Sequence, residues 1–295
     1  MRQPSILKVY RQTQAMNDYH EAKARAATAY NAAADHFDHP ANSFWDRFGQ
    51  ETVSRLGLRP GDAVLDVCSG TGASAIPAAE RVGTTGTVIG VDLAENLIEL
   101  AAAKARKLGL DNLGFRTGDM LSLGYDDASF DAVICVFGIF FVPDMPAAVR
   151  ELWRMLRPGG KLAITTWGPN FFEPANATFW EAVREVDPSL HKSFNPWDRI
   201  SEPAALGGML RDAGVGNFEI AAEPGVHPIS SPEDWWATLM GSGYRGTLDR
   251  LQPLDLEGVR KRNMDFVRES GIAGVEANVL YARATKLGAP APGLQ

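Results

Sequence analysis

The stretch that starts at residue 64 is Val64-Leu65-Asp66-Val67-Cys68-Ser69-Gly70-Thr71-Gly72. Its apolar first half predicts a strand, and the Ala-rich segment after its small residues predicts a helix. Glycine lets a ligand come close to the backbone, and the N–H groups at a helix N-terminus are free to bind it. We therefore predict that a nucleotide-like cofactor binds the loop between this strand and this helix.

Two cofactors are compatible with the loop. Residues 70–75 match the G-x-G-x-x-A fingerprint of dinucleotide-binding proteins, and Asp92 lies 20 residues after Gly72, at the spacing of a ribose-binding acid. Both features favour NAD. The Asp66 carboxylate at the strand end, however, would repel the pyrophosphate of NAD. It suits a cofactor that carries an ammonium group and a sulfonium, which favours S-adenosylmethionine.

The same stretch resembles motif I of the class I S-adenosylmethionine-dependent methyltransferases. Segments that resemble the family's second strand, adenine loop, fourth strand and turn into the fifth strand follow in order at residues 88–93, 118–120, 130–136 and 156–162. The resemblance covers about residues 60–168. In addition, residues 30–38 are similar to the helix before motif I in the small-molecule methyltransferases of menaquinone and ubiquinone biosynthesis.

This resemblance implies roles for individual residues. Asp92 would bind the ribose, and Asp119 would approach the adenine amino group while Met120 packs on the ring. Cys68 stands where the family usually has glycine, and a small apolar filler is the alternative interpretation of this residue. The implied cofactor-binding residues are Asp66, Cys68, Ser69, Gly70, Thr71, Gly72, Asp92, Leu93, Asp119, Met120, Val136 and Tyr30.

Methyl transfer from a sulfonium is an in-line displacement with a good leaving group. The protein therefore mainly aligns the acceptor and excludes water, and no strong catalytic dyad is required. Aromatic residues near the strand ends could wall such a pocket and tolerate the nearby sulfonium. The residues predicted to line the acceptor pocket are Phe137, Phe140, Phe141, Trp167, Phe171 and His191. We assign no catalytic residue and no metal ligand.

The net charge of the chain limits the classes of partner that it is expected to bind. The chain of 295 residues carries a formal net charge of −7 and is 45% hydrophobic, which disfavours nucleic acid and anionic membranes. Residues 136–141 also lack the Asn/Asp-Pro-Pro-Tyr/Phe element of the family's members that methylate amino groups of nucleic acids. We therefore expect a small-molecule acceptor, with neither nucleic acid nor membrane as partner.

Targeting and redox signals are weak. The first 30 residues lack the apolar run of a signal peptide, and the longest apolar run, 132–142, is too short to span a membrane. The two cysteines, Cys68 and Cys135, fall near predicted strand ends and are not expected to form a disulfide. These features predict a cytoplasmic protein.

Strand and helix patterns alternate up to residue 166, which predicts an α/β fold with a Rossmann-like, doubly wound sheet. The resemblance implies seven strands, mostly parallel, with an antiparallel strand near the C-terminus. We expect an N-terminal arm and helices covering the active site (1–57), the S-adenosylmethionine-binding core (58–168), an aromatic-rich lid insertion and helix (169–215), C-terminal strands with a helical insertion (216–287) and a disordered tail (288–295).

Local sequence patterns predict several further structural features of the chain. Residues 1–14 are expected to form a mobile arm, and the charged run 21–25 a solvated helix face. A helix over 95–108 should end at Gly109, and another helix is predicted over 145–156.

Two late features are also expected. His227 is predicted to lie in a loop, and the Trp235-Trp236 pair to be exposed, as part of a lid or of a homodimer interface. The function predicted overall is methyl transfer from S-adenosylmethionine to a small organic acceptor. A non-catalytic binding scaffold and an NAD(P)-dependent oxidoreductase are the alternatives.

Overall fold

A single seven-stranded sheet forms the centre of the computed structural model, which describes the backbone of residues 6–288 and the side chains of residues 19–288. The strand order is β3-β2-β1-β4-β5-β9-β6. The strands are β1 Ala63–Val67, β2 Thr87–Asp92, β3 Leu113–Thr117, β4 Phe130–Val136, β5 Leu156–Trp167, β6 Phe218–Glu223 and β9 Val279–Thr285. Only β9 runs antiparallel to its neighbours, so the predicted fold class is confirmed.

The strand order places a crevice at the carboxyl end of the sheet. From the central β1 the chain moves outward to β2 and β3, and it then returns to the other side of β1 through β4 and β5. In such open sheets, ligands bind outside the carboxyl ends of the strands where the order reverses. The loops after β1, β2 and β4 therefore meet at one edge.

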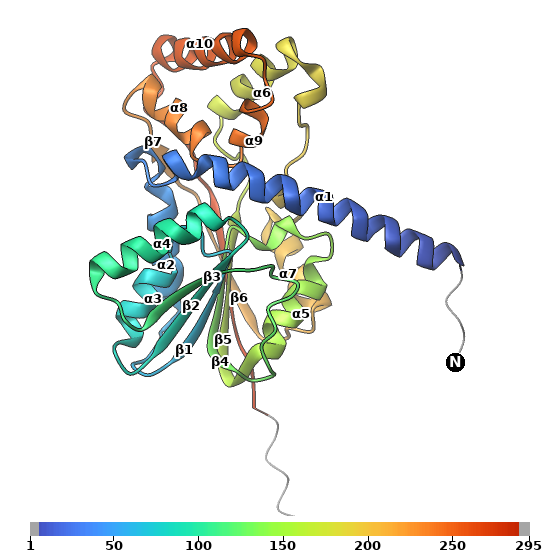
Figure 1. The fold of residues 1–295 in the computed structure, drawn as a ribbon, viewed down its shortest axis with the longest axis vertical. Helices are drawn as coiled ribbons and strands as arrows, with labels where there is room; N and C mark the ends of the chain where they lie inside the picture. The colour runs from blue at the N-terminus through green and yellow to red at the C-terminus, as the bar shows by residue number, and fades with distance from the viewer. Residues whose placement is uncertain (1–5, 289–295) are drawn as a thin grey trace, which may run out of the picture.

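Helices cover both faces of the sheet (Figure 1). The predicted helix over 95–108 is present with these bounds and ends at Gly109 in the left-handed conformation, whereas the helix predicted over 145–156 ends at Met155, because Leu156 already belongs to β5. The flanking helices are α2 Phe44–Leu56, α3 Ala75–Val82, α4 Glu95–Leu108, α5 Met145–Met155 and α7 Pro203–Asp212.

A second helical layer lies beyond the carboxyl edge of the sheet (Figure 1). Its members come from two separate parts of the sequence, the insertion between β5 and β6 and the insertion between β6 and β9. These two insertions pack against each other. The layer, which we call the upper layer, contains α6 Ala175–Val186, α8 Pro232–Met240, α9 Arg245–Leu248, α10 Pro253–Ser270 and the two-stranded ribbon of β7 Val226–Pro228 and β8 Gly274–Glu276. The four short 3-10 helices are η1 Pro40–Asn42, η2 Ile139–Phe141, η3 Pro188–Leu190 and η4 Pro196–Ile200.

The N-terminal helix α1, Ile6–Phe37, passes between the sheet edge and the upper layer. Its first half projects beyond the rest of the molecule (Figure 1). The segment predicted as a mobile arm over 1–14 is helical from residue 6 onward, as part of α1, and its mobility stays a prediction. Residues 1–5 lie outside the described part of the chain, as does most of the tail predicted at 288–295.

Two predictions about the upper layer were wrong. Trp235 is fully buried, because α10 covers α8 and Asn263 on α10 accepts a hydrogen bond from the indole nitrogen at 3.0 Å. His227 lies in β7 rather than in a loop, and its Nε2 is 2.7 Å from the carbonyl oxygen of Ala41. Trp236 is partly exposed, and the homodimer stays a prediction.

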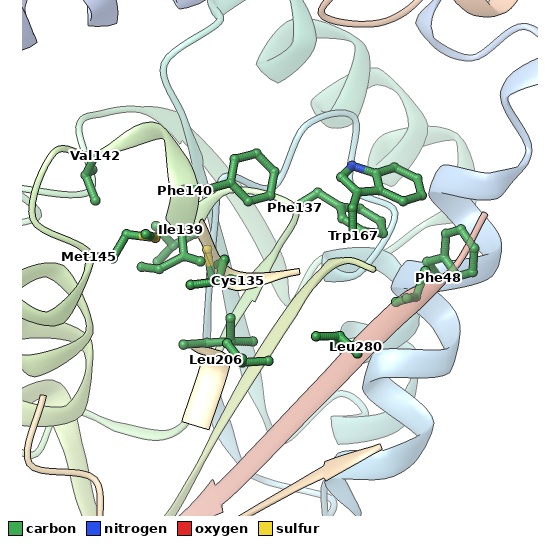
Figure 2. Packing of buried hydrophobic residues seen from close by; sticks show 14 of the residues in the cluster. Phe48, Cys135, Phe137, Ile139, Phe140, Val142, Met145, Trp167, Leu206 and Leu280 are labelled. Carbon is green, nitrogen blue, oxygen red and sulfur yellow. The ribbon is translucent and has the colours of Figure 1, made fainter. Parts of the chain in front are cut away.

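The main core continues from the sheet into an aromatic cluster at its carboxyl edge. Figure 2 shows Phe137, Phe140 and Trp167 above the aliphatic residues Leu206 and Leu280 of the same cluster. Both cysteines are free thiols, as predicted. Within the described residues, no helix has both the length and the apolar character that crossing a bilayer requires.

Candidate active site

The loop after β1 adopts a strained, compact path. Cys68 has a φ of 60°, in the left-handed region where a residue other than glycine costs about 1–2 kcal/mol. This conformation gives a physical reason for the glycine that related sequences usually carry there. Gly72 also has a positive φ, and a Cβ on it would come 3.1 Å from the ring of Phe115.

Asp66 lies behind this loop, fully buried. Its Oδ2 accepts a hydrogen bond from the Ser74 hydroxyl at 2.7 Å, and its Oδ1 has no partner among the described residues. Burial and, to a lesser extent, the nearby charge of Asp92 raise the pKa of this carboxyl group to about 7, although the hydrogen bonds from Ser74 and from the Ala75 amide lower it.

Asp92, at the end of β2, braces the loop from the other side. Its two carboxylate oxygens accept hydrogen bonds from the backbone N–H groups of Gly70 and Ala94, each at 2.9 Å. Burial raises the pKa of Asp92 despite these two donors. The carboxylate therefore stands at the point where the loop and the first turn of α4 meet.

Asp119, in the loop after β3, is held by α1. The Tyr19 hydroxyl donates to Oδ1 at 2.8 Å, and the Lys23 ammonium donates to Oδ2 at 2.7 Å. Burial opposes ionisation of this carboxyl group, but these two donors and the Leu121 amide outweigh it and lower its pKa. The expectation that the run 21–25 is only a solvated face was therefore wrong for Lys23.

These residues surround a cavity of about 990 Å³, which we call the first cavity. Its wall contains every residue predicted to bind the cofactor except two. Asp66 and Gly72 lie behind the wall, and Asp66 reaches it only through Ser74. The predicted residues that line it are Cys68, Ser69, Gly70, Thr71, Asp92, Leu93, Asp119, Met120, Val136 and Tyr30.

Several wall residues were not among the predicted cofactor contacts. Tyr19, Lys23, Phe37 and Trp45 come from α1 and α2 and close the first cavity from above. Thr71 is also tied to the end of α1, because its hydroxyl donates to Asp38 at 2.6 Å. The spacing of residues 19, 23, 26, 27 and 30 on one helix face was the available signal.

A second cavity of about 680 Å³ adjoins the first. Phe137, Phe140, Phe141, Trp167 and Phe171 line this second cavity, together with aromatic residues of the upper layer. His191 lines neither cavity, and its ring lies 6.1 Å from that of Trp180. The chain turns after η3, so that the next residue, Lys192, lines the second cavity instead.

The two cavities share part of their walls. Tyr30, Trp45, Phe137 and Phe141 line both of them. Phe137 stacks on Trp167 with ring centroids 4.0 Å apart, as Figure 2 shows, which fixes the shared wall to the end of β5. Ligands that occupied both cavities would therefore lie next to each other.

Few polar groups line the second cavity, and two of them form hydrogen bonds within the protein. Tyr244 donates to Asn176 at 2.6 Å, and burial raises the pKa of its hydroxyl well above the usual value. Ser242 donates to the Thr238 carbonyl at 2.7 Å. No histidine lines either cavity, and the described residues contain no cluster of three or more His, Cys, Asp or Glu that could hold a metal ion.

Comparisons with known proteins agree with this site. Residues 64–160 match a family model described as a methyltransferase domain. The chain is 39% identical over 159 residues to a demethylmenaquinone methyltransferase of Oceanobacillus iheyensis, covering 52% of this chain and 67% of that protein. It is 33% identical to the enzyme of the same description from Listeria welshimeri, covering 57% and 76% of the two chains.

Solved structures show the same fold. A SAM-dependent methyltransferase from Aquifex aeolicus superposes with a TM-score of 0.50 at 24% identity, covering 65% of this chain and 91% of the other. Residues 64–160, the range of the family model, contain the motif I loop and β2 to β4, whereas α1 and α2 lie outside that range.

Proposed function

Because this chain belongs to the class I S-adenosylmethionine-dependent methyltransferases, in the group that resembles demethylmenaquinone methyltransferases, we propose that it methylates a ring-bearing small molecule in the second cavity. The observation that carries this proposal is the shared wall of Tyr30, Trp45, Phe137 and Phe141. It would place a methyl donor in the first cavity directly beside an acceptor in the second.

The first cavity fits S-adenosylmethionine by the chemistry of its donors and acceptors. Asp92 would accept hydrogen bonds from the ribose hydroxyls, and Asp119 would accept one from the adenine amino group. Met120 supplies an apolar surface for the adenine ring. Asp66, which accepts a hydrogen bond from Ser74, would hold the Ser74 hydroxyl in place at the amino acid end of the cofactor. When bound, the cofactor supplies an electrophilic methyl group on a sulfonium.

The chain's own residues would promote transfer by alignment and exclusion of water. Aromatic faces at the junction of the cavities stabilise a nearby positive charge, and the apolar walls hold the acceptor in line with the methyl carbon. Tyr244 is protonated at neutral pH, since the pKa of a tyrosine already lies well above 7 and burial raises it further. The proposed mechanism uses no general base from the cavity walls and favours acceptors that are nucleophilic by themselves.

Calorimetry tests the cofactor site first. The wild-type protein and the variants Asp92→Ala and Asp92→Asn would be titrated with S-adenosylmethionine, S-adenosylhomocysteine and NADH. Loss of hydrogen bonds to a charged group costs about 1.5–3 kcal/mol, so we expect both variants to bind the first two ligands at least roughly tenfold more weakly. Asp111, an exposed acid on the turn before β3, provides the matched control variant Asp111→Ala.

Turnover tests the acceptor. A panel of ring-bearing and aliphatic nucleophiles would be incubated with S-adenosylmethionine that carries a tritiated methyl group. We expect label in ring-bearing products only. Binding of NADH without S-adenosylmethionine would contradict the cofactor assignment, and label confined to aliphatic products would contradict the assignment of the second cavity. Cofactor binding with no labelled product from any acceptor would favour a non-catalytic scaffold.

A further inference from the structure

The second cavity opens into a groove between α1, α9 and the segment around η4, which we call the entrance groove. The groove and the second cavity share Tyr30, Phe140, Phe141 and Lys192. Its wall is largely apolar and includes Phe194, whose side chain is 55% exposed. A molecule can therefore reach the second cavity past these residues.

The wall of the entrance groove carries a net positive charge, whereas the whole chain carries a net negative charge. The chain carries a net charge of −7, yet the groove wall contains four cationic side chains and a single carboxylate, Asp249. That carboxylate already accepts a hydrogen bond from Arg245 at 2.6 Å. The cationic residues are Arg25, Lys192, Arg199 and Arg250.

Two of the four cations are occupied by the protein itself. Arg25 forms an ion pair with Glu21 at 3.3 Å. Arg199 donates to the carbonyl oxygens of Phe140 and Val142, at 3.2 and 3.4 Å. These contacts give Arg25 and Arg199 structural roles in the groove wall.

The other two cations, Lys192 and Arg250, make no side-chain hydrogen bond or ion pair with residues 19–288. Lys192 also lines the second cavity, where its Nζ lies 5.6 Å from the centre of the Trp180 ring. Burial lowers the pKa of Lys192, and the charges of Arg250 and Arg25 lower it further. Asp187 already accepts hydrogen bonds from the hydroxyl and the amide of Ser189, which lower its pKa, and the charge of Arg250 lowers this pKa to a lesser extent. The two cations therefore repel each other, and the one carboxylate in the groove wall, Asp249, is already bound to Arg245.

Resting on the proposed function, we propose that the acceptor is a ring-bearing carboxylate whose anionic group binds Lys192 and Arg250. The aromatic walls accept the ring, and the two cations at the entrance accept the charge. The ammonium of Lys192 and the guanidinium of Arg250 both donate to carboxylate oxygens, and the guanidinium can bind a carboxylate through two parallel hydrogen bonds. Lys192 and Arg250 then determine specificity and take no part in the transfer step.

Matched pairs of acceptors test this proposal. The probes are 6-hydroxy-2-naphthoate with 6-hydroxy-2-naphthamide, and 3-hydroxybenzoate with 3-hydroxybenzamide. Each would be titrated into protein saturated with S-adenosylhomocysteine, so that no turnover is needed. We expect at least one carboxylate to bind about tenfold more tightly than its amide. That ratio should fall to near one in Lys192→Met and Arg250→Met.

The control variant is Lys107→Met, which removes an exposed lysine at the end of α4, outside the entrance groove. It should keep the wild-type ratio of carboxylate to amide affinity. The proposal is overturned if no carboxylate binds more tightly than its amide, or if the ratio survives in both groove variants. A separate titration of each variant with S-adenosylhomocysteine reports on the cofactor site, so a failure of the proposed function is distinguishable.

Discussion

At the scale of single residues, burial controls the chemistry of Asp66. No part of this side chain is exposed, and only one of its oxygens has a hydrogen-bond partner among the described residues. Burial raises its pKa from an ordinary value of 3.8 to about 7. At neutral pH the carboxyl group is therefore balanced between its neutral and its charged form, beside the loop that the cofactor needs.

This balance predicts a pH-dependent stability. Because the pKa is higher in the folded than in the unfolded chain, the stabilising contribution of Asp66 is complete below about pH 4. It is lost as the pH rises through the folded pKa of about 7. We expect Asp66→Asn to gain thermal stability relative to wild type from pH 5 to pH 8, measured by circular dichroism without cofactor. The control Asp111→Asn should follow the wild-type curve, and a pH-independent difference for Asp66→Asn would refute the explanation.

At the scale of elements, α1 is both a wall of the first cavity and a contact to its acidic loop. Tyr19 and Lys23 bind Asp119, and Tyr30 lines both cavities two to three turns further along the same face. The first half of the helix projects from the molecule (Figure 1). Among residues 19–288, the tertiary contacts of α1 begin at Tyr19, so we expect the helix to resist opening from about this residue onward.

Amide hydrogen exchange followed by mass spectrometry checks this division. We expect fast exchange over residues 6–18, where the helix is unsupported, and slow exchange over 24–37. Addition of S-adenosylhomocysteine should slow exchange over 19–30, because the ligand would contact this face, and should leave α10 unchanged. Uniform protection along α1, or no response of 19–30 to a ligand that binds, would contradict this description.

At the scale of the whole molecule, the upper layer rests on the segment between α1 and α2. The Ala41 carbonyl oxygen contacts His227 Nε2 at 2.7 Å, and the Asn42 amide donates to the carbonyl oxygens of His36 and Ala237. A Cβ on Gly241 would lie 2.2 Å from Asn42 Nδ2 and 2.4 Å from the His36 oxygen. These contacts of Ala41, Asn42 and Gly241, which we call the seam, hold the upper layer over the two cavities.

Gly241→Ala should open the seam. Overpacking of this kind costs about 1–3 kcal/mol, and urea denaturation would measure the lowered free energy of unfolding. Gly258→Ala is the control, because its added methyl group meets open space on α10. It should stabilise the protein by about 0.4–1 kcal/mol. Wild-type stability in Gly241→Ala would show that the seam is not tightly packed.

Much of the fold and part of the site could be predicted from local patterns. The strand, loop and helix at 64–82, the helix over 95–108 and the acids that end strands are short-range features, since periodicity and glycine placement act within a few residues. Asp92 was predicted from its spacing after Gly72 and Asp119 from the resemblance to the family's adenine loop, and the structure brings both to one cavity because the carboxyl ends of parallel strands lie at one edge of a sheet.

The sequence by itself therefore determined the sheet, its family and the motif I loop. The tertiary structure alone decided that Lys23 contacts Asp119, that Trp235 is buried and that Lys192 rather than His191 lines the second cavity. Such contacts join residues up to about 200 positions apart, as His227 and Ala41 show. They depend on the path of the whole chain, because which face of a helix is covered follows from the elements packed on it and not from its own pattern.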